Sequence, residues 1–305
     1  MALGTNHVTN ATAGTFIPEL WSDEIIAAYK QNLVMANLVS KMSFKGKKGD
    51  TLHIPKPTRG AASAKAASTQ VTLQAATESE VQVLVNKHYE YSRLIEDITE
   101  AQALASLRQF YTGDAGYALA KQVDTDLIQL GRGVQGGDGS ADYNKAVLGG
   151  DGSTLYVDGT NVGTALTDAG IRRIIQTLDD QDVPMDGRVL VVPPSARNTL
   201  MGLARFTEQA FTGETGGGNT IRNGQIGDVY GVKVYVTTNA DTATTNTTRL
   251  AMLFHKDAFV LAEQMGVRSQ TQYKQEYLGT LFTSDMLYGV KELRDEAAIA
   301  IAVPA

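Results

Sequence analysis

The stretch GQIGDVYGVKVYVTTN, residues 224–239, places three glycines, Gly224, Gly227 and Gly231, before an alternating segment. In that segment valine occupies every second position, which predicts a strand with one apolar face. Glycines that cradle a phosphate stand between a strand and a helix N-terminus, whereas these glycines lead into a strand. We therefore expect them to shape the backbone of a turn, by positive φ or close chain approach, and to bind no ligand.

A second short segment, or one of the strands next to it, is expected to pair with that strand. Residues 188–192 read RVLVV, and such a nearly continuous apolar run is typical of a strand buried on both faces. Before it, Thr167 can cap a helix whose aliphatic residues recur at positions i, i+3, i+4 and i+7. After it, Pro193 and Pro194 are expected to end the strand, and Ser195 to cap the next helix.

Composition narrows the class of protein. The chain has 305 residues, which suggests about two domains, and 43% hydrophobic residues, which excludes bulk disorder. It has no cysteine, so disulfides, thiol catalysis and zinc–thiolate sites are excluded. A net charge of −6 does not favour a dedicated nucleic-acid binder. The sequence contains neither a run long enough to span a membrane nor a signal peptide.

The N-terminal part of the chain cannot bury itself. Its first residues are polar and rich in Thr, Ala and Asn, so they form either a disordered tail or an arm that orders on a neighbouring subunit. A helix is predicted from Pro18 to about Ser40.

A long hairpin is predicted next. Residues 51–54 read as a short strand ended by Pro55, and a second strand begins near Glu80. Residues 56–79 between them are rich in Ala, Ser and Thr and have almost no large apolar groups, so the hairpin should project from the body. Six cations accompany the anion Asp50 in this region: Lys45, Lys47, Lys48, Lys56, Arg59 and Lys65. The hairpin is either simply solvated or a charged surface that docks on an acidic neighbour.

The rest of the chain predicts an α+β fold. The longest helical tract runs from about Thr99 to Gly131, with a break or kink expected at Gly113 and Gly116. A Gly-rich and Asp-rich loop follows, over residues 131–163. The C-terminal part reads as strands, over residues 250–253, 259–261, 267–287 and 293–303.

Motifs of known chemistry are absent from the sequence. The four histidines form no pattern typical of metal ligands, and neither a nucleophile elbow nor a phosphate-binding loop occurs. The repeated GGDGS lacks the aspartate that a calcium-binding β-roll needs. We therefore expect no enzyme activity, and no catalytic, cofactor-binding or metal-ligating residue.

Several segments, in the same order, resemble tailed-phage major capsid proteins. FIPELWSDEIIAAYKQNLVMANLVS resembles their N-terminal arm and helix, and KGDTLHIP resembles the start of their extended loop. HYEYSRLIEDIT with the long helix after it resembles their spine helix. DVPMDGRVLVVPP and residues 224–239 resemble their axial domain, and RLAMLFHKDAFVLAEQM with LRDEAAIAIAV resembles the last strands of their peripheral domain.

This resemblance implies the Hong Kong 97-like capsid fold. It assigns residues 1–43 to an N-terminal arm and helix, and residues 44–80 to the extended loop. It assigns residues 81–131 and 250–305 to the peripheral domain with its spine helix, and residues 132–249 to the axial domain. The cations of the hairpin are then candidates for contacts between subunits.

The resemblance also implies a function. Hexamers and pentamers of the chain would assemble into an icosahedral shell that encloses double-stranded DNA without sequence-specific binding. The chain would be made in the cytoplasm of a host bacterium and reside in the virion, with no membrane contact. Because the arm begins almost at once, a scaffolding protein is expected to be separate; a portal and a decoration protein are further expected partners.

Two alternatives remain at this point. An encapsulin-type nanocompartment has a shell of the same fold, but the Thr-, Ala- and Asn-rich arm favours a phage. A secreted adhesion protein would suit the Thr, Ala and Gly content, but the chain lacks repeats and a signal peptide.

Overall fold

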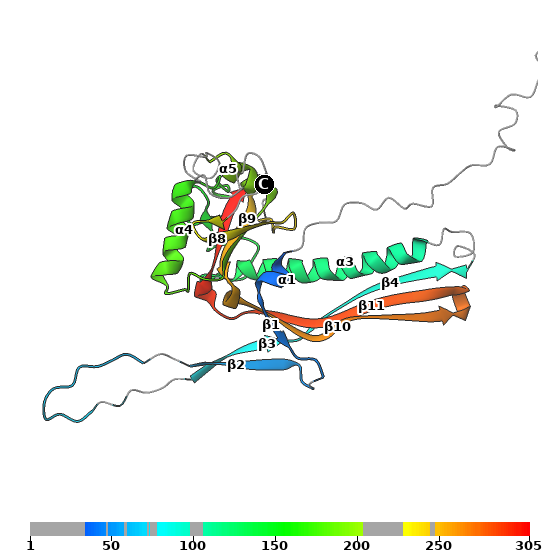
Figure 1. The fold of residues 1–305 in the computed structure, drawn as a ribbon, viewed down its shortest axis with the longest axis horizontal. Helices are drawn as coiled ribbons and strands as arrows, with labels where there is room; N and C mark the ends of the chain where they lie inside the picture. The colour runs from blue at the N-terminus through cyan, green and yellow to red at the C-terminus, as the bar shows by residue number, and fades with distance from the viewer. Residues whose placement is uncertain are drawn as a thin grey trace, which may run out of the picture.

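The computed structural model describes residues 34–46, 48–57, 60–71, 73, 78–97, 106–203, 228–244 and 248–305. Figure 1 shows a compact unit around one sheet, a long unit in which a helix runs beside extended strands, and a hairpin that projects from the body. Among the described residues, no helix is both long and apolar enough to cross a bilayer.

A six-stranded sheet organises the compact unit. Its order is β5 (Val147–Leu148), β12 (Ala298–Pro304), β9 (Thr248–His255), β6 (Arg188–Val192), β8 (Val232–Val236) and β7 (Asp228–Val229). The pairs β5–β12 and β6–β8 are parallel, and the other neighbours are antiparallel. The strand after Gly231 therefore pairs with residues 188–192, as the sequence predicts.

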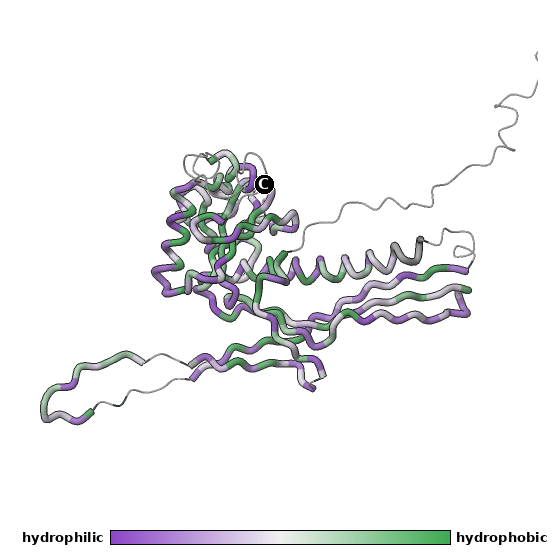
Figure 2. The backbone as a smooth tube through the Cα atoms, in the orientation of Figure 1, coloured by the Kyte–Doolittle hydropathy of each residue, from purple (hydrophilic) through white to green (hydrophobic). Residues whose placement is uncertain are grey.

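Both faces of this sheet are covered. Along β6, Val189 and Val191 enter one core, while Leu190 and Val192 enter the other, so the strand is buried throughout. Helices α4 (Asp168–Asp180) and α5 (Pro194–Met201) supply the second core. Figure 2 shows hydrophobic residues gathered in this unit. The predicted cap is confirmed, since the Thr167 hydroxyl accepts a hydrogen bond from the Gly170 N–H.

The turn between β7 and β8 explains Gly231. Val229 pairs with Val232, which leaves Tyr230 and Gly231 as a two-residue loop. Their φ angles are 50° and 80°, so both adopt the left-handed conformation typical of tight hairpins. Glycine adopts this conformation without a steric cost, and the expected role of Gly231 in the backbone is confirmed.

The long unit consists of one helix and a four-stranded sheet. Helix α3 (Ser106–Gln129) continues into the short 3₁₀ helix η2 (Leu130–Arg132). The sheet has the order β1 (Ser40–Ser43), β10 (Phe259–Lys274), β11 (Gly279–Glu292) and β4 (Lys87–Glu96). Short helices punctuate the chain: α1 (Met35–Leu38), η3 (Lys256–Ala258), η4 (Gln275–Tyr277) and η5 (Asp295–Ala297). The long C-terminal strands predicted from the sequence are confirmed.

Three local predictions are wrong. Helix α3 continues through Gly113 and Gly116. Each glycine costs about 1 kcal/mol of helix stability, and the packing of the buried Leu119, Val123 and Leu127 against the core outweighs that cost. Pro55 lies inside β2 and does not end it, as a strand with a free edge tolerates proline. Ser195 does not cap α5; Pro193 is the N-cap, and the Ser195 hydroxyl donates to the Pro304 carbonyl.

The sheets also divide the chain differently from the expected domains. Strands β9 and β12 join β6 and β8 in the compact sheet, although residues 250–305 were assigned to the peripheral domain. The same segment contributes β10 and β11 to the long sheet, so a boundary at residue 250 does not separate the two sheets. The helix predicted from Pro18 lies largely outside the described residues, which include only α1 at its end.

Candidate functional site

The projecting hairpin is the candidate site. It consists of β2 (Thr51–Pro57) and β3 (Glu78–Leu84), paired antiparallel from Thr51 opposite Leu84 to Pro57 opposite Glu78. These strands form a separate two-stranded sheet (Figure 1). The predicted long hairpin is therefore present, and its strands are longer than the sequence indicated.

The base of the hairpin is packed against the body. Val83 and Val85 are buried with Val260 and Ala262 of β10. The Val85 N–H donates to the Asp50 carbonyl at 2.8 Å. A Cβ at Gly289 of β11 would lie only 2.2 Å from the Leu84 carbonyl oxygen, so glycine permits this close approach. The base of the hairpin is thus packed against β10 and β11 of the long sheet.

The described residues of the distal part have no comparable packing within their own chain. Every described residue from Gly60 to Val71 is exposed, and so is Leu73. Two of these side chains are large and apolar: Val71 is 66% exposed and Leu73 is 92% exposed. Apolar side chains in such positions mark a surface that a partner can cover.

The candidate cations form a strip rather than a cluster. Lys45 precedes the hairpin and contacts Glu263 of β10 at 3.6 Å. Lys48 lies just before β2, Lys56 lies near its far end, and Lys65 lies in the distal loop; all three are exposed. Strand β2 is seven residues and about 23 Å long and separates Lys48 from Lys65, so these charges cannot converge on one ligand. Lys47 and Arg59 lie outside the described residues.

Strand pairing also adds anions that the expected charge balance omitted. Glu80 and Glu78 of β3 lie opposite Pro55 and Pro57 of β2. Hydrogen bonds from Gln82 and then His53 lower the pKa of Glu80, so this carboxylate is ionised at neutral pH. The hairpin strands therefore carry both signs of charge. The alternating β3 sequence was the signal that could have revealed this.

The glycine turn does not join the hairpin to form one site. Gly231 belongs to the β7–β8 turn at the end of the six-stranded sheet, while Gly224 and Gly227 lie outside the described residues. The Tyr230 hydroxyl beside Gly231 donates to Asp168 at the start of α4, which fixes the turn on that helix. The contacts of this turn stabilise the fold of the compact unit.

Two buried carboxylates of α3 fix this helix to the elements around it, and sequence reasoning missed both. Asp124 accepts hydrogen bonds from the backbone N–H groups of Val34 and Met35 and from the Asn239 amide. Burial raises the pKa of Asp124, and these hydrogen bonds oppose that rise. Nothing in the local sequence distinguishes Asp124 from an exposed helical aspartate.

The second carboxylate, Asp126, joins α3 to the long sheet. Lys87 of β4 approaches it at 3.0 Å, and the Tyr288 hydroxyl of β11 donates to it at 2.7 Å. Burial, together with the Asp126 charge, raises the pKa of Tyr288, so this phenol stays protonated as a donor. The arrangement stabilises the interface between helix and sheet.

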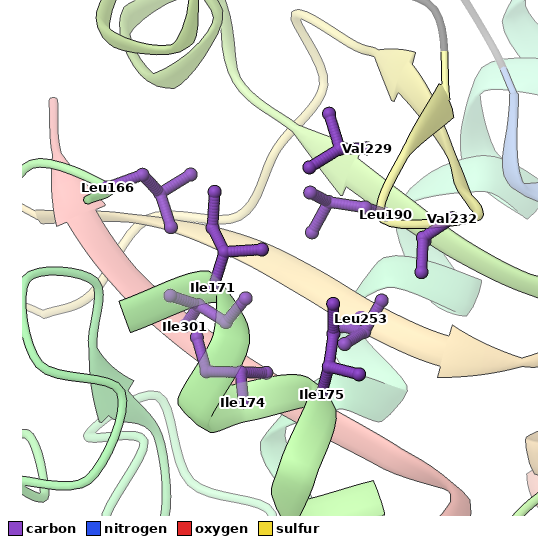
Figure 3. A pocket seen from close by; sticks show the side chains of 9 residues that line it. All are labelled: Leu166, Ile171, Ile174, Ile175, Leu190, Val229, Val232, Leu253 and Ile301. Atoms are coloured by element: carbon purple, nitrogen blue, oxygen red, sulfur yellow. The ribbon is translucent and has the colours of Figure 1, made fainter. Parts of the chain in front are cut away.

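The interior of the compact unit contains a small apolar cavity. A small cavity between α4 and the six-stranded sheet is lined by aliphatic side chains alone: Leu166, Ile171, Ile174, Ile175, Leu190, Val229, Val232, Leu253 and Ile301 (Figure 3). Its volume of about 10 Å³ has room for one water at most, and it lacks the polar partners that a water needs. Within the described part of the chain, no group of three or more acidic or histidine side chains is arranged to bind a metal.

Comparison with known proteins identifies what the fold resembles. A family model described as phage capsid protein matches residues 16–303. A search of curated proteins found no match.

Solved structures match the fold over nearly the whole chain. A structure from Mycobacterium phage Che8 has a TM-score of 0.75 at 24% identity, covering 94% of this chain and 97% of that one. The capsid of cyanophage Pam1 has a TM-score of 0.74 at 13% identity, covering 99% of both chains. The capsid of cyanophage P-SCSP1u has a TM-score of 0.73 at 16% identity, covering 99% and 96%. These similarities establish the Hong Kong 97-like fold.

Proposed function

This chain belongs to the phage capsid protein family, and we propose that its projecting β2–β3 hairpin makes the principal contact between neighbouring subunits of the shell. The chain is a major capsid protein of a tailed phage: a structural protein of the virion, which forms an icosahedral shell and is not an enzyme. The proposal concerns how copies of the chain hold one another.

One observation carries it: the distal hairpin leaves apolar side chains uncovered. Val71 and Leu73 are mostly exposed in a loop whose described residues are all exposed. Burying both on a neighbour would contribute on the order of 2–4 kcal/mol before the cost of ordering the loop. Since each subunit both gives and receives a hairpin, this modest gain is repeated around a ring and across the shell.

The charges of the hairpin suit the same role. Lys48, Lys56 and Lys65 are exposed and spread along the hairpin from its base to its distal loop. We propose that they contact acidic surfaces of the next subunit. Such exposed pairs contribute little affinity, but they set register and orientation. We propose that Lys45 also contacts the neighbouring subunit but contributes less to the interface, since it already pairs with Glu263 of its own chain. We include Lys47 and Arg59 in this proposal only because of their positions in the sequence.

We further propose that the subunits assemble as hexamers and pentamers, with the long unit as the peripheral domain and the compact unit as the axial domain. On this assignment Gly231 of the β7–β8 turn belongs to the axial domain, as do Gly224 and Gly227. Neighbouring subunits converge near this domain. A separate scaffolding protein, a portal and a decoration protein complete the proposed set of partners.

The enclosed double-stranded DNA is proposed to be held without sequence-specific binding. The net charge of −6 disfavours strong attraction to phosphates. An encapsulin shell would share this fold. The matching family model describes phage capsid proteins, and two of the named structural neighbours are cyanophage capsids, which favours the phage.

Electron microscopy of the full chain, expressed alone and with its candidate scaffolding protein, tests the assembly. Closed shells or isolated hexamers and pentamers are expected. A chain that stays monomeric at high concentration, with and without the scaffold, would contradict the proposal.

A substitution at the hairpin tests the contact itself. Leu73→Asp should leave the far-UV circular dichroism and the unfolding midpoint of the subunit unchanged, because the side chain is 92% exposed, yet should reduce shell yield severely. Leu73→Met, which keeps an apolar side chain, is the matched control and should assemble. Equal assembly of both variants would overturn the role of the hairpin while leaving membership of the family intact.

A further inference from the structure

Two carboxyl groups meet where the two sheets are joined. Glu292 is the last residue of β11 in the long sheet, and Asp295 is the first residue of η5, which leads into β12 of the compact sheet. Both face the turn after α3: a Cβ at Gly133 would lie 2.8 Å from Oε2 of Glu292, and a Cβ at Gly136 would lie 4.0 Å from Oδ2 of Asp295. The pair therefore lies between β11, η5 and the end of the spine helix.

This joint is held by hydrogen bonds to the same turn. The Gln135 side-chain amide donates to the carbonyls of Glu296 and Ala298 at 3.2 and 3.0 Å, and its backbone N–H donates to the Asp295 carbonyl at 3.4 Å. From the other side, the Leu293 N–H donates to the Ala258 carbonyl at 2.8 Å. Any repulsion within the carboxyl pair acts directly on these bonds.

The electrostatics of the pair are unfavourable when both groups are ionised. Oδ1 of Asp295 is buried and has no hydrogen-bond partner among the described residues. Burial first, and then the hydrogen bond and charge of Asp295, raise the pKa of Glu292 to about 7. Two carboxylates that share a site cannot both ionise cheaply, and one proton between them relieves both the repulsion and the desolvation.

Nearby charges do not neutralise the pair. Lys291 lowers the Glu292 pKa, but it contributes the smallest of the effects. Glu292 and Asp295 line an open groove of about 580 Å³. Lys56 and Glu80 of the hairpin line it too, and they carry opposite charges. Arg132 at the end of η2 is paired with Asp241. On η3, Lys256 and Asp257 bring one charge of each sign, and Arg294 and Glu296 on the connector are exposed.

We propose that Glu292 and Asp295 share one proton at neutral pH, and that its release loosens the joint between the two sheets and the base of the β2–β3 hairpin, making this joint a pH-sensitive hinge. The sign follows from linkage. The folded chain raises the pKa of Glu292 from its ordinary value of 4.5 to about 7. The stabilisation of the joint is therefore fully present below pH 4.5 and is lost as the pH rises through about 7. Alkaline conditions thus favour movement of the compact unit and hairpin relative to the long unit.

Hydrogen–deuterium exchange of the full chain tests the hinge. Protection is measured at pH 6 and pH 8, corrected for the intrinsic pH dependence of exchange, in peptides covering residues 130–137, 288–298 and 78–85. In the wild type, protection there should fall by about tenfold between the two pH values, while α4 stays unchanged. Glu292→Gln, which keeps a hydrogen-bond donor and cannot ionise, should abolish the fall.

Two further variants make the test specific. Glu296→Gln removes an exposed charge on the same connector and should behave as the wild type. Asp295→Asn removes the neighbouring charge and should move the transition to lower pH, which decides the matter if Glu292→Gln fails to fold. Unchanged wild-type protection between pH 6 and 8, an equal fall in Glu292→Gln, or an unmoved transition in Asp295→Asn would each overturn the hinge.

Discussion

The Met35 backbone N–H donates a 2.8 Å hydrogen bond to Oδ1 of Asp124, although 89 residues separate them. The other oxygen of Asp124 accepts from the Asn239 amide at 3.2 Å. Asn239 ends the stretch that begins at Gly224, so one buried carboxylate of α3 fixes both the start of α1 and the chain leaving β8. The point at which the N-terminal segment joins the body is therefore set by the spine helix.

Asp124→Ala should destabilise the chain by about 2–3 kcal/mol, because it strands buried N–H donors of α1 and the Asn239 amide. Asp124→Asn should cost less, since it keeps an acceptor for Met35 and removes a carboxylate whose pKa burial has raised. Urea unfolding of the two variants beside the wild type measures the difference. An alanine variant as stable as the asparagine variant would contradict this role of Asp124.

Gly289→Ala should destabilise the seating of the hairpin by about 2 kcal/mol or more, because a Cβ there would lie 2.2 Å from the Leu84 carbonyl oxygen. Faster hydrogen exchange in β3 is the direct measurement. Gly116→Ala is the matched control: nothing lies within 4 Å of its Cβ position, and it sits within α3. That variant should gain up to about 1 kcal/mol of stability, and a loss at Gly116 would show that the helix needs glycine there.

Elements whose signal is local could be predicted from the sequence. The alternation after Gly231 and the apolar run of β6 specify strands without reference to the rest of the chain, and their pairing is confirmed. The exposed hairpin was also predictable, since a segment without large apolar residues cannot bury a face.

What failed depends on distant partners. The continuity of α3 through Gly113 and Gly116 comes from packing further along the helix, and the placement of β9 and β12 beside β6 comes from the path of the whole chain. The burial of Asp124 and the pairing of Glu292 with Asp295 have no local signature. The strand register places Glu78 and Glu80 of β3 beside β2, and only this pairing shows that they contribute to the charge of the hairpin.

Tyr288→Phe should cost about 1–2 kcal/mol, because it removes the hydroxyl that donates to Asp126 from β11. The loss should stay moderate, since Lys87 at 3.0 Å and Gln122 at 3.1 Å still contact the Asp126 carboxylate. Thermal unfolding, compared at the midpoint, measures it. Tyr277→Phe, at a side chain that is 62% exposed, is the control and should leave the midpoint unchanged; equal shifts in the two variants would argue against the buried contact.

Acid should weaken the long sheet through Asp285. Arg268 of β10 contacts both of its oxygens, at 3.1 and 2.7 Å, and His88 of β4 approaches at 3.2 Å. The Arg268 hydrogen bonds first, and His88 next, lower the pKa of Asp285 from 3.8, so its contribution is present above that value and is lost as pH falls through the lower, folded-state value.

The measurement is the free energy of unfolding between pH 5 and pH 2.5. Asp285→Asn should be less stable than the wild type at pH 5, and the two should converge as the pH falls, because protonation removes in the wild type what the substitution has already removed. Asp186→Asn, at an exposed loop position, should track the wild type throughout. A constant difference between Asp285→Asn and the wild type over this range would mean that the carboxylate charge does not hold β10, β11 and β4 together.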